Sequence, residues 1–174
     1  MNYFVITAVG EDKPGIVAKV TKILYENGFN IEDSTMTRLN NEFCIMLVVK
    51  GEKGEKEIED SFSSIKDKDL SIWIKQIPED VINKKKEVAS LYNIIVFGAD
   101  KPGIVFNVSK ILADHNVNIS DLRTEKNNDL YLMFIQAEVP SSTNQEDLEN
   151  AIKKVSKDMN IDISLEKVEE PAEL

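Results

Sequence analysis

One short segment of the sequence carries groups that could recognise a small charged molecule, and it occurs twice. Gly10-Glu11-Asp12-Lys13-Pro14-Gly15-Ile16-Val17 is echoed by Gly98-Ala99-Asp100-Lys101-Pro102-Gly103-Ile104-Val105, at an offset of 88 residues. A loop that ends at a helix N-terminus offers backbone N–H groups and a positive partial charge to a carboxylate. Asp12 and Asp100 could pair with an ammonium group. Asn30 and Asn118, at the same offset, each offer a donor and an acceptor, which suits a zwitterion.

Each of these residues also has a purely structural explanation, which the sequence leaves open. The two aspartates are suited to cap the following helix. The motif glycines, Gly15 and Gly103, could allow either a ligand or a neighbouring strand to approach the backbone closely. The two asparagines could fix a turn.

The repeat extends well beyond the motif and predicts two domains. From Gly10 to Asp33, 14 of 24 positions are identical to those of residues 98–121, without a gap. Such self-similarity indicates a duplicated structural unit. A polar segment that begins near Pro78 separates the two copies. We therefore predict a first domain over residues 1–78, a linker over 79–90, a second domain over 91–169 and an acidic tail over 170–174.

The first half of each unit has the pattern of a strand followed by a helix. Apolar runs from Tyr3 to Val9 and from Leu91 to Phe97 indicate buried strands. Pro14 and Pro102 suit the first position of a helix. Apolar residues then recur at helical spacing, at Ile16, Val20, Ile23 and Leu24 and again at Ile104, Val108, Ile111 and Leu112.

The second half of each unit predicts a hairpin, a helix and a closing strand. Polar turns at Asn40-Asn41 and at residues 127–129 separate the hairpin strands. Ile58, Phe62 and Ile65 mark the second helix of the first unit, and the capping-box spacing from Thr143 to Glu146 marks its counterpart. The order βαββαβ, repeated, predicts an α+β fold: two ferredoxin-like sandwiches in tandem, each an antiparallel sheet with helices on one face.

At these motifs both halves resemble the ACT domain family, whose pattern is a strand, a loop of the form Asp-x-Pro-Gly-Ile/Val, a helix and Asn-Ile at the start of the second strand. The tandem arrangement, with no appended enzyme, is similar to the glycine cleavage system transcriptional repressor group. The resemblance implies an amino acid held between the first loop of one module and the second strand of its neighbour. The implied ligand-binding residues are Asp12, Gly15, Ile16, Asn30, Ile31, Asp100, Gly103, Ile104, Asn118 and Ile119.

No residue pattern in the sequence predicts catalysis, a cofactor or a metal site. His115, the only histidine, falls at the predicted end of a helix, where it would face solvent or interact with the helix C-terminus. Cys44, the only cysteine, lies in an apolar run and indicates a small buried hydrophobe. We therefore expect a non-enzymatic protein without a cofactor.

Charge and hydropathy limit the partners. The 31 acidic and 21 basic residues give a net charge of -10, which opposes binding to nucleic acid or to an anionic membrane surface. The sequence has neither an apolar run of about 18 residues nor the basic segment of a signal peptide, so we expect a cytoplasmic location.

The predicted sheets leave one face for a partner. Trp73 alternates with Ile72 and Ile74, which places it on the opposite face of the sheet from these two residues. Apolar residues on both faces favour pairing between modules and a homodimer. The main hypothesis is a sensor that binds an amino acid and passes the signal to a protein partner, such as a transcriptional regulator. The alternative is a constitutive protein-interaction scaffold without a ligand.

Overall fold

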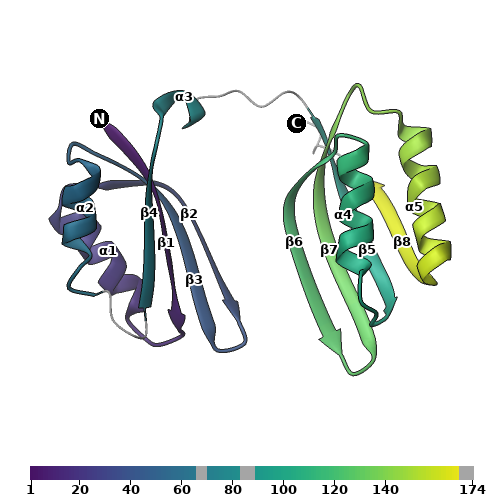
Figure 1. The fold of residues 1–174 in the computed structure, drawn as a ribbon, viewed down its shortest axis with the longest axis horizontal. Helices are drawn as coiled ribbons and strands as arrows, with labels where there is room; N and C mark the ends of the chain where they lie inside the picture. Colours follow the sequence, from purple (N-terminus) through teal and green to yellow (C-terminus); the bar gives the residue numbers. More distant parts are fainter. Residues whose placement is uncertain (66–69, 83–88, 169–174) are drawn as a thin grey trace, which may run out of the picture. The chain divides into compact units, whose positions relative to one another are not determined.

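The structure, a computed structural model, describes residues 1–65, 70–82 and 89–168 (Figure 1). The chain divides into two compact units, Met1–Lys85 and Lys86–Leu174. The predicted linker, 79–90, includes a short helix, α3 (Glu79–Ile82), and the first residues of strand β5. The rest of that linker and the acidic tail fall outside the described residues, so the predicted domain boundaries stay predictions. None of the helices in the described ranges combines the length and the apolar character that a membrane span requires.

The first unit is a four-stranded antiparallel sheet with two helices on one face (Figure 1). The strand order across the sheet is β2-β3-β1-β4, so that β2 and β4 are its edges. Its elements in chain order are β1 (Asn2–Glu11), α1 (Ile16–Glu26), β2 (Asn30–Leu39), β3 (Glu42–Gly51), α2 (Glu55–Ser61) and β4 (Leu70–Ile77).

The second unit repeats this architecture, with strand order β6-β7-β5-β8. Its elements are β5 (Ala89–Ala99), α4 (Ile104–Asp114), β6 (Asn118–Asn127), β7 (Leu130–Pro140), α5 (Gln145–Met159) and β8 (Ile161–Lys167). The predicted fold, two ferredoxin-like βαββαβ sandwiches in tandem, is confirmed.

Each unit has its own core between the helices and one face of the sheet. In the first unit alternate residues of β1, among them Phe4 and Ile6, are fully buried against the apolar stripe of α1. Phe29, just after α1, packs edge-on against Phe4 with ring centroids 5.9 Å apart. In the second unit the equivalent apolar stripe on α4 includes Val108 and Leu112. The apolar residues that alternate along the strands and those that recur every 3.6 residues along the helices therefore pack together in one buried layer per unit.

The structure corrects the predicted starts of the first helices. Pro14 and Pro102 lie in the turn before each helix, not at its first position, because the N-cap residues are Gly15 and Gly103. Neither helix has a side chain that caps its N-terminus, so the alternative in which Asp12 and Asp100 cap the helices is wrong.

Two other expectations need correction. The cap of α5 is Asn144, not Thr143: its side-chain oxygen accepts hydrogen bonds from the N–H groups of Glu146 and Asp147. The Thr143 hydroxyl donates instead to the carbonyl oxygen of His115 at 3.3 Å. Cys44 is half-buried, because it faces away from the helices. His115, as expected, lies at a helix C-terminus, where its Nδ1 is 2.8 Å from the carbonyl oxygen of Ile111.

Candidate functional site

The first motif forms a tight turn that presents the N-terminus of α1. Gly15 has φ +90°, a left-handed conformation that L side chains rarely adopt. An added Cβ there would meet no atom within 4 Å, so the glycine is required by its backbone angle and not by tight packing. The Ile16 N–H reaches the Lys13 carbonyl at 3.3 Å. Helix geometry leaves the next two N–H groups, of Val17 and Ala18, without partners inside the helix.

The second motif builds the same turn at the start of α4. Gly103 has φ +93° and its carbonyl accepts the Asn107 N–H at 2.9 Å. Ile104 is buried in the core, whereas its counterpart Ile16 is half-buried. Both isoleucine side chains therefore hold the helix start against the core.

The two motif aspartates are held by their own units. Asp12 lies 3.5 Å from the Arg38 guanidinium, and Asp100 accepts a hydrogen bond from Lys126. The backbone N–H of each aspartate also donates to the turn of the adjacent hairpin, at 2.8 and 2.9 Å. Each loop is thus tied to the tip of the β2–β3 or β6–β7 hairpin.

Arg38 and Lys126 were not predicted as site residues, although their spacing in the sequence marks them. They are separated by the same 88 residues as the motifs, and each lies just before a hairpin turn. The hydrogen bond to Asp100 raises the pKa of Lys126. Burial raises the pKa of Tyr131, which lies beside this pair, with a smaller contribution from the Asp100 charge.

Asn30 and Asn118 lie at the start of the edge strands β2 and β6, and both are exposed. The Asn30 amide donates to the Glu32 carboxylate at 2.7 Å, and the Asn118 amide donates to Glu138 at 2.8 Å. Each amide therefore keeps its carbonyl oxygen as an acceptor. Asn30 also lines a shallow hollow of about 560 Å³ with a polar rim.

The isoleucines that follow these asparagines differ between the units. Ile31 is 38% exposed, whereas Ile119 packs against the second core. Both face the helix side of the sheet, because they pair with Val49 and Ala137 on the neighbouring strands.

A single unit does not bring the two halves of the predicted site together. Asn30 opens β2, whereas Arg38, the partner of Asp12, lies near the other end of this strand. At about 3.3 Å per residue the two ends are roughly 25 Å apart. The same holds for Asn118 and Lys126 on β6. A ligand that touches both a loop and an asparagine must therefore lie against two modules.

The described residues offer no group of three or more His, Cys, Asp or Glu side chains arranged to hold a metal ion. The polar groups that the two motifs expose are helix N–H donors, amide oxygens and ion pairs.

Comparison with known families gives a match over both units. The model of the ACT domain family matches residues 2–71 and 93–166. The glycine cleavage system transcriptional repressor of Escherichia coli (strain K12) is 29% identical to this chain over 165 residues, which cover 91% of the chain and 86% of the relative.

Two crystal structures have the same fold over 97% of the chain. One is of an unknown protein from Galdieria sulphuraria, with a TM-score of 0.81, 26% sequence identity and 99% of its own length covered. The other, described as a candidate glycine cleavage system transcriptional repressor, has a TM-score of 0.74, 23% identity and 98% of its length covered.

Proposed function

The chain belongs to the ACT domain family, and from that premise we propose that it is a non-catalytic regulatory protein that binds an amino acid and transmits the binding event to a protein partner. The family match and the similarity to a transcriptional repressor support a regulatory, ligand-sensing role. The observation that carries the proposal is the loop built twice, with a left-handed glycine that opens a helix without a side-chain cap.

The ligand's carboxylate would bind the free N–H groups at the start of α1 or α4. There the helix dipole adds a positive partial charge, which stabilises an anion. The helix start also lies in an exposed loop, where the small glycine leaves room for a ligand.

The ligand's ammonium group would bind the asparagine of a neighbouring module. Asp12 and Asp100 are less suited to this role than the motif suggests, since each already neutralises a cation of its own unit. The amide oxygens of Asn30 and Asn118 remain as acceptors. This division explains why the site would need two modules and why binding would fix their relative orientation.

The signal would pass to a protein and not directly to DNA. The net charge of -10 opposes contact with phosphates, so a role in transcription would act through another regulator. We also propose a homodimer, because the helix-free sheet faces carry exposed apolar side chains such as Trp73 and Phe134, which are 60% and 40% exposed.

A thermal-shift screen against the twenty amino acids tests the proposal. A ligand that binds only the native state stabilises it by about 2.7 kcal/mol at a hundredfold excess over its Kd. We expect a selective rise in Tm, lost in the double variant Asn30→Ala, Asn118→Ala. Asn93→Ala, which removes an exposed strand asparagine outside the motifs, should keep the response.

The scaffold alternative predicts a different result. If no amino acid at several millimolar changes Tm, and the asparagine variants bind partners as the unaltered chain does, the loops are structural and the chain acts as a constitutive interaction module.

A further inference from the structure

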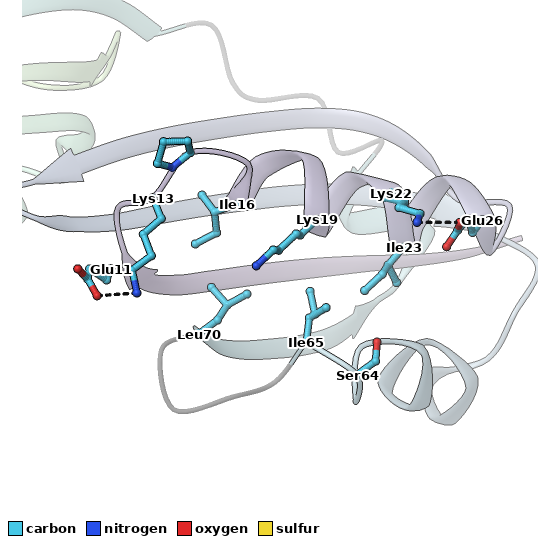
Figure 2. A pocket seen from close by; sticks show the side chains of 11 residues that line it. Glu11, Lys13, Ile16, Lys19, Lys22, Ile23, Glu26, Ser64, Ile65 and Leu70 are labelled. Atoms are coloured by element: carbon cyan, nitrogen blue, oxygen red, sulfur yellow. Dashed lines mark ion pairs between the residues drawn. The ribbon is translucent and has the colours of Figure 1, made fainter.

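The first unit has a groove on its helix side that shares only one residue, Ile16, with the predicted amino-acid site. It lies between α1 and three residues near α2 and β4, namely Ser64, Ile65 and Leu70 (Figure 2). Its volume is about 540 Å³, within the range of small-molecule sites. Four apolar side chains form its floor: Ile16, Ile23, Ile65 and Leu70. This floor is part of, or packs directly against, the buried core of the unit.

Three lysines line the groove, and they are not equivalent. Lys13 lies 2.8 Å from Glu11 at one end, and Lys22 lies 3.6 Å from Glu26 at the other. Lys19, between them, has no carboxylate partner among the residues that the structure describes. Figure 2 shows its side chain directed into the groove, toward the floor.

The second unit, which repeats the fold, differs at the position of Lys19 and in the helix that lies beside the first helix. The position of Lys19 is taken by Asn107, whose amide donates to the Gly103 carbonyl at 2.9 Å. Helix α5 has 15 residues, compared with 7 in α2, and its Ile152, Val155 and Met159 belong to or pack against the core beside α4. The second helix of the second unit is thus longer than its counterpart in the first unit.

We propose that the groove of the first unit binds a small monocarboxylate with a branched apolar group. The apolar group would lie on the isoleucine and leucine floor, and the carboxylate would pair with the Lys19 ammonium. A zwitterionic amino acid fits less well, because the two lining carboxylates, Glu11 and Glu26, are already paired with lysines. The ligand class is therefore a carboxylic acid without an α-ammonium group.

The test is an NMR titration of the ¹⁵N-labelled full chain with 4-methylpentanoate, which is leucine without its amino group. We expect saturable shift changes in α1, Ser64, Ile65 and Leu70, and weaker binding of both 4-methylpentanamide and leucine. Lys19→Gln, at an exposed site, should weaken 4-methylpentanoate binding by up to about fivefold. Lys110→Gln, the counterpart of Lys22 in the second unit, should leave it unchanged.

Several outcomes would overturn the groove site. These are the absence of shift changes up to several millimolar, equal changes at α1 and α4, or an unaltered affinity in a folded Lys19→Gln variant. The amide spectrum of each variant reports whether it folds. Because the probe lacks an ammonium group, its failure would leave the proposed amino-acid site standing, and the reverse also holds.

Discussion

At the scale of single residues, the repeated motif shows which side chains are already committed within their own unit. Asp12 and Asp100 are bound to a cation and to a hairpin turn. The N–H groups of Val17 and Ala18, at the start of α1, have no partner inside the helix. The sequence placed all these groups in one loop. Which of them stay available depends on Arg38 and Lys126, which lie 26 residues farther along the chain.

The Lys126–Asp100 pair predicts a pH dependence. Because the hydrogen bond to Asp100 raises the pKa of Lys126 above 10.5 in the folded chain, the pair contributes stability below that pH. This contribution is lost as the pH rises through the higher folded-state value. In an NMR titration of lysine side chains, Asp100→Asn should return Lys126 to the ordinary pKa. Asp121→Asn, which removes the partner of Arg123, should leave it unchanged. Identical Lys126 midpoints in the unaltered and Asp100→Asn chains would contradict this account.

The left-handed backbone of Gly15 predicts a second effect. Gly15→Ala should destabilise the first unit by about 1–2 kcal/mol, because a Cβ is strained at this φ. Gly15→Asn should cost less, since asparagine tolerates the left-handed region and adopts it elsewhere in this chain, as at Asn40. Chemical denaturation measures both. Equal losses would mean that the side chain disturbs something other than the backbone angle.

At the scale of helices and strands, hydrophobic spacing predicted nearly every element, but not its first residue. The stripe of α1 fixes the buried face, yet it does not say whether Pro14 or Gly15 ends the turn. The left-handed glycine moved the helix start two residues beyond the proline. In α5 two adjacent residues could cap, and the choice of Asn144 over Thr143 follows from the hydroxyl bond to His115. Such choices rest on contacts distant in sequence, which a local pattern does not contain.

The cap of α5 gives a prediction at this scale. Asn144→Ala removes the acceptor for two N–H groups and should cost about 1 kcal/mol of unfolding free energy. Thr143→Ala removes one bond to a loop carbonyl at 3.3 Å and should cost less. Urea unfolding measures the loss of unfolding free energy in each variant. A larger loss in Thr143→Ala than in Asn144→Ala would contradict the observed cap.

At the scale of the whole molecule, the repeat predicted two similar modules, whereas the expected position of a ligand between two modules came from the resemblance to the ACT domain family and not from the residue pattern. That asparagine and loop lie at opposite ends of a module follows from a ten-residue edge strand whose register the sequence does not reveal. The repeat likewise did not reveal the groove beside Lys19 or the difference in length between α2 and α5.

The helix-free face of the second sheet predicts how copies associate. Ile95 and Phe97 of β5 lie opposite Phe134 and Leu132 of β7, so that they form an apolar patch. Light scattering coupled to size exclusion should give twice the 19.7 kDa of the chain at micromolar concentration. Phe134→Ser should shift this balance toward the monomer. Phe106→Ser, an exposed phenylalanine on α4, should not. A monomer in the unaltered chain would refute the dimer.

The edge strands β2 and β6 affect the protein concentration at which the chain would aggregate. A long open edge can template the addition of strands without limit. Here each edge is interrupted by a register shift at the same place, between Ile31 and Asp33 and between Ile119 and Asp121. Both edges also carry charged side chains, such as Glu32 and Arg123, at exposed positions. The register shifts and the exposed charges would thus both oppose the addition of strands at these edges, and acid that neutralises the carboxylates would weaken only the opposition that comes from charge.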